Sequence, residues 1–255
     1  MIIIISPAKT LDFAAKPATE KYSLPLFSDM SEKLVKELRM YSPPKLEKLM
    51  KISSKLANLN YERYQEWHLP FSPQNSKQAL FAFRGEVYTG IDADTMTMDD
   101  INFAQHHLRI LSGLYGILRP LDLIQAYRLE MGTPLKTDKN KDLYQFWGDK
   151  LTNMLTNELD NEPGKILINL ASNEYYKALD SKKLNTRIIT PVFKDFKNGS
   201  YKFLSVYGKK ARGLMTRFII SNKIDNPENL KLFDDDGYFF NDRLSNRDDW
   251  VFTRG

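Results

Sequence analysis

The sequence predicts an α+β fold: a mixed sheet with flanking helices in a single mixed α/β domain over residues 1–255. The run Ile2–Ile5 is continuous and β-branched, as in a strand buried on both faces. Apolar residues then recur at helical spacing from 28 to 59, and the proline pair at 43–44 divides this pattern into two helices. No repeat or low-complexity linker interrupts the chain, so we expect one domain.

The remaining elements alternate between helical and strand patterns. Helices are predicted at about 61–67, 74–80, 99–111, 143–159 and 209–221, with another beginning at Pro120. Strands are predicted at 166–170, 187–193 and 201–207, and an edge strand at 250–252. Asn198-Gly199 lies between two of these strands and predicts a hairpin turn.

The composition excludes several classes of protein. The absence of cysteine excludes disulfides, iron–sulfur clusters and thiolate zinc sites. Of the three histidines, His106 and His107 are adjacent and cannot face one ion from a helix, so we expect no metal and no cofactor. The N-terminus lacks a basic segment and a long apolar run, which predicts a cytoplasmic protein without membrane contact.

The positive charge is segregated along the chain more strongly than the net charge of +5 suggests. Residues 194–217 carry seven Lys and Arg against one Asp, a balance of +6, whereas residues 225–255 have four against eight acids, a balance of −4. Lys209, Lys210 and Arg212 lie near the start of a predicted helix, where cations oppose the helix dipole. An external anion explains this placement, and a solvated helix face explains it equally well.

A short glycine-bounded segment, Gly113 to Gly116, lies between two predicted helices. Such an element is typical of a helix-hairpin-helix, in which glycines let backbone amides approach a DNA phosphate. An ordinary turn between helices remains the alternative. The residues predicted to contact DNA, here and in the basic segment, are Gly113, Tyr115, Gly116, Arg119, Arg128, Lys209, Lys210, Arg212 and Arg217.

Polar loops follow several predicted strands, which is where parallel sheets place their ligands. They predict an anion or ligand pocket formed by Ser6, Lys9, Arg84, Asn169 and Ser172. The catalytic residues are unknown, and the candidates are Lys9 and Asp138. No Walker A, GxGxxG, GxSxG or HExxH motif is present, so no reaction can be written from motif spacing.

Five segments carry a resemblance to a known family: residues 6–12, 111–122, 127–132, 143–148 and 209–215. In order and spacing they resemble the peroxide-stress protein YaaA family. The resemblance implies a bacterial cytosolic protein of the hydrogen peroxide response with a positively charged cleft, a helix-hairpin-helix and affinity for duplex and branched DNA. Ala126 departs from the proline expected there, which puts only the local backbone rigidity in doubt.

The family is also described as limiting free intracellular iron. Because this sequence lacks cysteine and clustered histidine, direct iron storage is a less favoured explanation than DNA protection or repair. We therefore expect non-enzymatic binding to duplex, bubble or junction DNA with little sequence preference. Two alternatives stay open: a glycosylase- or lyase-like enzyme on damaged DNA, and an enzyme acting on a small anionic substrate at a site that contains Lys9.

Overall fold

A mixed eight-stranded sheet forms the centre of the computed structural model, which describes residues 1–255. Its strands are β1 (Ile2–Ile5), β5 (Leu108–Ser112), β6 (Gly116–Leu118), β8 (Ile166–Leu170), β9 (Arg187–Lys197), β10 (Ser200–Lys202), β11 (Phe239–Phe240) and β12 (Asp249–Arg254). They lie in the order β11-β12-β9-β8-β1-β5-β6, and β10 pairs with the far end of β9. The strands from β12 to β5 are parallel, and the outer pairings are antiparallel. The predicted mixed α/β fold is confirmed.

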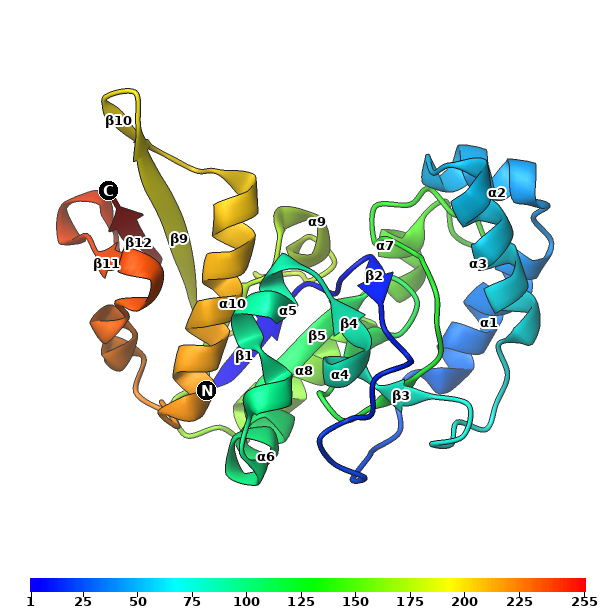
Figure 1. Ribbon diagram of the computed structural model, residues 1–255, viewed down its shortest axis with the longest axis horizontal. Helices are drawn as coiled ribbons and strands as arrows, with labels where there is room; N and C mark the ends of the chain where they lie inside the picture. Colours follow the sequence, from blue (N-terminus) through cyan, green and yellow to red (C-terminus); the bar gives the residue numbers. More distant parts are fainter.

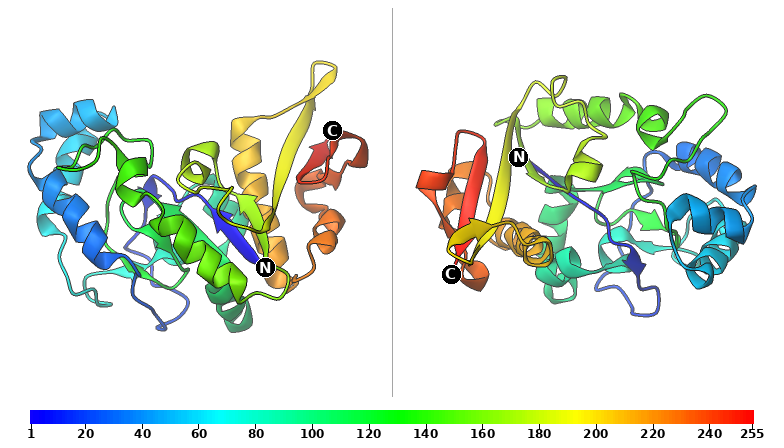
Figure 2. Two further views of the ribbon diagram at one scale, coloured as in Figure 1. Left: turned by 180° about the vertical axis from the view of Figure 1, so that it is seen from behind. Right: turned by 90° about the horizontal axis from the view of Figure 1, so that it is seen from above.

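Helices cover both faces of the sheet. They are α1 (Ser28–Arg39), α2 (Pro43–Met50), α3 (Ser54–Glu66), α4 (Ala79–Ala82), α5 (Glu86–Ile91), α6 (Met98–His107), α7 (Leu143–Trp147), α8 (Lys150–Asp160), α9 (Asn173–Tyr176) and α10 (Ser205–Ser221). Figures 1 and 2 show α5, α6 and α10 on one face, α8 on the other, and α1 to α3 grouped at one end. None of these helices combines the length and apolar character that crossing a membrane requires.

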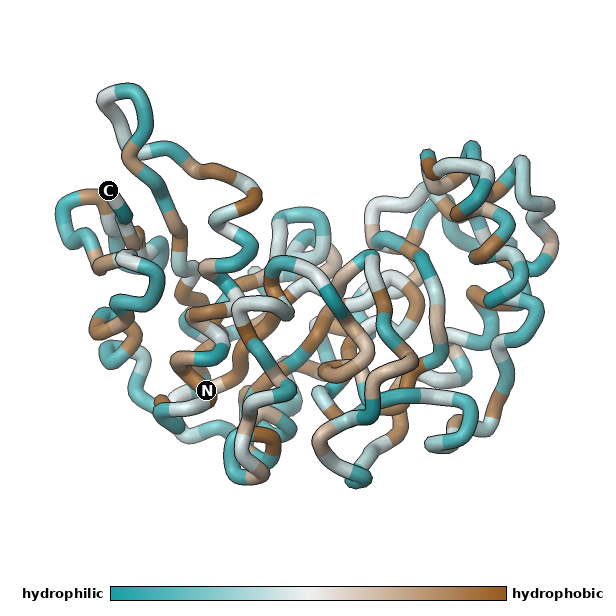
Figure 3. The backbone as a smooth tube through the Cα atoms, viewed as in Figure 1, coloured by the Kyte–Doolittle hydropathy of each residue, from teal (hydrophilic) through white to brown (hydrophobic).

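Strand β1 lies between two parallel neighbours, β8 and β5, and its four isoleucines are buried. Ile5 pairs with Ile110 of β5 on one side and with Leu170 of β8 on the other. One contiguous core of 65 buried apolar residues surrounds it, and Figure 3 shows the central strands as mostly hydrophobic. Two short pairings flank this sheet: β2 (Thr10–Leu11) with β4 (Phe83–Arg84), and β3 (Lys77–Gln78) with β7 (Leu123–Ile124).

Helices α5 and α10 cross at backbone contact. A Cβ atom added to Gly213 of α10 would lie 1.9 Å from the carbonyl oxygen of Val87, and one added to Gly90 of α5 would lie 2.4 Å from that of Lys210. Only glycine on both helices permits this approach. The crossing holds the first half of α10 beside the segment that follows β4.

The helix-hairpin-helix predicted around Gly113 is wrong. Helix α6 starts after Thr97, which forms a capping box with Asp100, and it ends at His107. The chain continues as β5, turns at residues 113–115 and returns as β6, with Ser112 paired to Gly116. The apolar positions of 101–111 fit a helical period, but a strand buried on both faces carries no alternation that would reveal it. Pairing with β1 makes residues 108–112 a strand and not the end of a helix.

Other local differences have similar causes. The helix predicted at Pro120 is a turn, in which the carboxylate of Asp122 accepts from the backbone N–H of Arg119 at 2.8 Å. Residues 74–80, predicted as a helix, contribute strand β3 and the start of α4, while the strand predicted over 201–207 gives way to α10 at Ser205. Strand β12 lies between β9 and β11 and is not an edge strand. The Asn198-Gly199 turn is confirmed, with both residues at positive φ.

The glycine crossing predicts a strong effect of a single methyl group. Gly213→Ala should lower the free energy of unfolding by about 2–3 kcal/mol, because the methyl group meets backbone that cannot rotate away. Urea denaturation measures this loss. Gly164→Ala is the matched control, since its Cβ would meet only the Ile166 side chain at 3.4 Å and should leave stability nearly unchanged. Equal stability of Gly213→Ala and wild type would show that the helices can separate freely.

Candidate functional site

A cavity of about 410 Å³ lies beyond the carboxyl ends of β1 and β8. It is lined by Ser6–Thr10, Arg84–Tyr88, Glu130, Leu170, Ser172, Glu174, Tyr175, Lys209 and Arg212, and is called the strand-end cavity below. The chain leaves β1 toward β5 on one side and later returns to β8 on the other. Ligands in parallel sheets bind at such a reversal of strand order. The predicted pocket residues Ser6, Lys9, Arg84 and Ser172 are therefore brought together.

Helix α10 places two cations at this cavity, one turn apart. The guanidinium of Arg212 makes no hydrogen bond and no ion pair with the protein. Its Cζ atom lies 5.9 Å from the centroid of the Phe203 ring in a cation–π contact. Burial lowers the pKa of Arg212 because no carboxylate compensates its charge. Lys209 is exposed and likewise has no carboxylate partner. Partial burial of a cation without a counter-charge has a desolvation cost, which a bound anion would offset.

Carboxylates line other parts of the same cavity. Glu130 forms ion pairs with Lys9 at 2.6 Å and with Arg128 at 3.1 Å. Glu174 accepts the backbone N–H of Gly132 at 2.9 Å through Oε1. Glu86, in the first turn of α5, is exposed. The cavity thus presents cations from α10 and acceptors from these glutamates.

Hydrogen bonds fix the ends of the two parallel strands. The backbone N–H of Ser172 donates to Oγ of Ser6 at 2.9 Å, and the hydroxyl of Tyr88 donates to the Ser6 carbonyl at 3.2 Å. Burial raises the pKa of Tyr88 and Tyr175, so both remain neutral phenols. Asn169, also predicted here, lies below the cavity, where its side chain accepts from the Ala171 N–H at 3.2 Å. Its role is to shape the turn that presents Ser172.

A second cavity of about 410 Å³ adjoins the first. It is lined by Leu49–Lys51, Glu130, Gly132–Pro134 and Glu174, so Glu130 and Glu174 belong to both cavities. The two form one groove, which runs from α10 to the end of α2. In Figure 1 these helices lie on either side of α9 and β2.

The far end of the groove is a helical hairpin formed by α2 and α3. The two helices are joined at Lys51, which has a left-handed backbone with φ of 52°, and the side chain of Ser53 caps α3 by accepting from the N–H of Leu56. The exposed lysines of this α2–α3 hairpin have no carboxylate partners; they are Lys45, Lys48, Lys51 and Lys55. Sequence analysis placed a continuous helix here, although Ser53 is a residue type favoured at helix starts.

Comparison with protein families assigns the chain. The family model described as peroxide stress protein YaaA matches residues 1–244 of 255. The chain belongs to the peroxide stress protein YaaA family. It is accordingly a protein related to peroxide stress. Two of the segments that carry the sequence resemblance line the strand-end cavity of this YaaA-family protein. They are residues 6–12 and 209–215.

Several cations predicted to contact DNA have partners inside this YaaA-family protein. Lys210 lies 3.6 Å from Asp236 of the acidic C-terminal segment. The guanidinium of Arg217 donates to the carbonyls of Ile91 and Asp92, where it caps the end of α5. Of the four basic residues predicted on α10, Lys209 and Arg212 line the cavity. The acidic segment thus neutralises part of the charge that the sequence shows as unbalanced.

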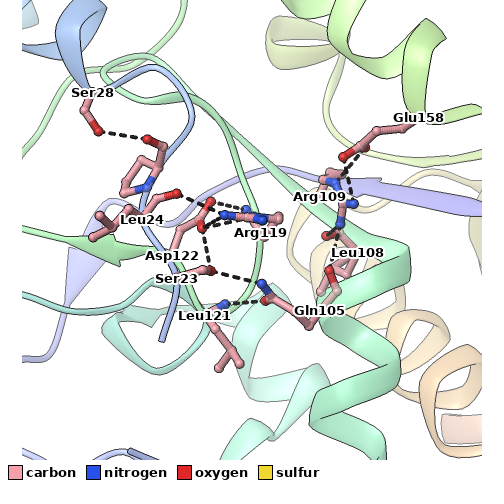
Figure 4. Close-up of polar contacts among 11 residues, drawn as sticks. Ser23, Leu24, Ser28, Gln105, Leu108, Arg109, Arg119, Leu121, Asp122 and Glu158 are labelled. Carbon is pink, nitrogen blue, oxygen red and sulfur yellow. Dashed lines mark hydrogen bonds and ion pairs between the residues drawn. The ribbon is translucent and has the colours of Figure 1, made fainter. Parts of the chain in front are cut away.

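The residues of the expected hairpin lie in the core. Gly113, Tyr115 and Gly116 are buried, and the carbonyl of Gly113 accepts from the indole N–H of Trp147 at 3.0 Å. Figure 4 shows Arg119 directed at Asp122 and Arg109 at Glu158. Arg128 pairs with Glu130. The amides expected to hold a phosphate are therefore enclosed by protein.

The two catalytic candidates occupy different places. Lys9 is paired with Glu130 in the strand-end cavity, whereas Asp138 is exposed and lines a separate cavity beside α1 and α7. No group of three His, Asp or Glu side chains lies close enough together to hold a metal ion. The geometry brings together cations without carboxylate partners and hydrogen-bond acceptors at one place, the strand-end cavity.

Arg109 is predicted to stabilise the fold. Its guanidinium makes two hydrogen bonds to Glu158, at 2.8 and 2.9 Å, and two more to backbone carbonyls of Gln105 and Leu108. Arg109→Ala should cost about 3 kcal/mol of unfolding free energy, because it leaves these acceptors without a donor. Chemical denaturation checks this, and the anion affinity of the protein that remains folded should match wild type. A fully stable variant would contradict the assignment.

Proposed function

We propose that this protein binds DNA in the groove between α10 and the α2–α3 hairpin, largely independently of sequence, and thereby protects DNA or assists its repair during peroxide stress. The observation that carries the proposal is the set of cations without carboxylate partners at both ends of the groove. Arg212 and Lys209 lie at one end, and Lys51 lies at the other. Elsewhere arginines such as Arg109 and Arg254 are neutralised by acids of the chain itself.

The distribution of these cations fits recognition of a phosphate backbone. Lysines that extend into solvent bind phosphates by charge, release counterions and carry no base specificity. Lys45 and Lys48 lie three residues apart on α2 and project from one side of that helix, Lys51 lies at its end, and Lys55 lies in the first turn of α3. Binding by phosphate contacts therefore predicts similar affinity for unrelated duplex, bubble and junction sequences.

The α2–α3 hairpin also offers backbone donors. Helix α3 has 13 residues and begins at Ser54 immediately after the left-handed turn at Lys51, so its first N–H groups lie next to the exposed lysines. Helix starts favour phosphate because free amides and the helix dipole act together. The Leu56 N–H is taken by Ser53 and the Ser54 hydroxyl donates to Glu47 at 2.6 Å, so the N–H groups of Ser54 and Lys55 are the donors that a phosphate would use.

The proposed binding is consistent with a role in peroxide stress. Iron and hydrogen peroxide generate hydroxyl radicals, which break and modify DNA. A protein that covers or holds damaged or branched DNA meets this threat through phosphate contacts, without a bond-making residue. The groove floor near Glu130 and Glu174 repels phosphate, which directs a bound backbone toward the cationic ends.

DNA binding should depend on the α2–α3 hairpin. Fluorescence-anisotropy titration of a labelled duplex and a four-way junction at several salt concentrations should show a linear log–log dependence, with a slope of about −0.9 for each phosphate neutralised. The double variant Lys51→Ala, Lys55→Ala should weaken binding to both DNAs alike and reduce the slope by about 1 for each lost phosphate contact.

The matched control removes the same charge elsewhere. Lys16 and Lys21 are exposed in the loop between β2 and α1, which lies at the bottom of Figure 1 away from the groove. Lys16→Ala, Lys21→Ala should keep wild-type affinity. Salt-independent binding, or equal losses in the two double variants, would contradict binding in the groove.

A further inference from the structure

We propose that the strand-end cavity binds one nucleoside monophosphate unit, with its phosphate on Arg212 and Lys209 and its hydroxyl or amino donors on Glu174 and Glu86. The ligand is either a free nucleotide or a nucleotide at the end of a DNA strand. This site lies at the α10 end of the proposed DNA groove and uses its Arg212 and Lys209, but it requires neither bound DNA nor the lysines of the α2–α3 hairpin.

The phosphate position follows from the two cations of α10. Arg212 and Lys209 are separated by three residues, so both project from the same side of the helix. The guanidinium offers a planar pair of N–H donors that matches two phosphate oxygens, and the ammonium adds a point charge. Because Arg212 is half-buried at the cavity wall and its guanidinium has no hydrogen bond or ion pair within the protein, a bound phosphate would supply the counter-charge that the fold lacks.

The remaining lining fits a sugar and a base. Oε1 of Glu174 is held by the Gly132 N–H, while Oε2 has no partner within the protein, and Glu86 has no cationic partner. A free carboxylate oxygen can accept a hydrogen bond from the 3′-hydroxyl of a deoxyribose or from an amino group of a base. Val87, Tyr88, Leu170 and Tyr175 give the cavity an apolar part. A ligand with an anionic group, several hydrogen-bond donors and a flat apolar ring would contact the cations, the carboxylates and the apolar part of the cavity.

The size and place of the cavity agree with this ligand. About 410 Å³ lies within the range of pockets that enclose small molecules. The cavity opens at the reversal of strand order between β1 and β8, where mononucleotides bind in other parallel sheets. Inorganic phosphate alone would leave the carboxylates and the apolar part without a partner.

Isothermal titration calorimetry of the full chain tests the proposal with dAMP, deoxyadenosine and inorganic phosphate as separate probes. The same titrations with a short single strand, with and without a 5′-phosphate, distinguish the free from the DNA-borne nucleotide. We expect dAMP or the 5′-phosphorylated strand to bind at least about tenfold more tightly than deoxyadenosine, the unphosphorylated strand and inorganic phosphate. Arg212→Ala should abolish this preference.

Matched variants keep the result interpretable. Arg212 has no polar partner to lose, so its truncation should leave the fold intact, and Lys209→Ala provides a second, exposed position. Lys210→Ala removes a cation from the same turn that lies toward Asp236 and should bind the nucleotide as wild type does. Lys51→Ala, Lys55→Ala should weaken duplex binding without changing nucleotide affinity, which separates this site from the lysines at the other end of the proposed DNA groove.

Each possible result of these titrations either supports the nucleotide site or overturns it. Tighter binding of dAMP that is lost in Arg212→Ala assigns a free nucleotide, and the same dependence seen only with the 5′-phosphorylated strand assigns a strand end. Inorganic phosphate binding as tightly as dAMP would reduce the cavity to a simple anion site and overturn the proposal. Nucleotide binding that Arg212→Ala and Lys209→Ala leave unchanged, or no binding of either phosphorylated ligand, would overturn it as well.

Discussion

The backbone contact between Gly90 and Gly213 is the constraint on which the site depends. It allows α10 to lie directly on α5. Helix α5 begins at Glu86, immediately after β4, and its first residues line the cavity at the ends of the parallel strands. With any side chain at either glycine, the helices would have to separate, and Arg212 would move away from the cavity with α10. The position of the unpaired cations is therefore set by the absence of two side chains.

Pairing of charges separates cations that stabilise the fold from cations that are available to a ligand. Arg109, Arg119 and Arg217 have their donors occupied by carboxylates or carbonyls of the chain. Arg212 and Lys209 do not, although they belong to the same basic segment as Arg217. A stretch of positive charge in the sequence thus divides into structural and ligand-facing residues only once the neighbouring acids are placed. Arg254 illustrates this, because it pairs with Asp195 and Asp236 of two different segments.

The two proposals assign different kinds of recognition to the groove and to the strand-end cavity. Exposed lysines on the α2–α3 hairpin suit a repeating phosphate backbone, whose affinity rests on charge and counterion release. The half-buried Arg212 at the cavity wall suits one phosphate whose position is fixed by several neighbours. Glu130 and Glu174 line both cavities and connect these regions. Taken together, the two proposals place a DNA strand along the groove and one nucleotide at its end.

The sequence by itself determined the central strand, the turn at Asn198-Gly199, the basic start of α10 and the polar loops at the strand ends. Each depends on local chemistry: β-branched runs extend, glycine accepts a positive φ, and parallel strands place their following loops at one edge. Only the tertiary structure decided that residues 108–112 form a strand, because their apolar spacing fits a helix and pairing with β1 makes the choice. It also decided which cations have no carboxylate partner. Lys210 pairs with Asp236 of a distant segment, whereas Arg212 pairs with no acid. Contacts between residues far apart in the chain leave no periodic signal, so they could not be read from the sequence.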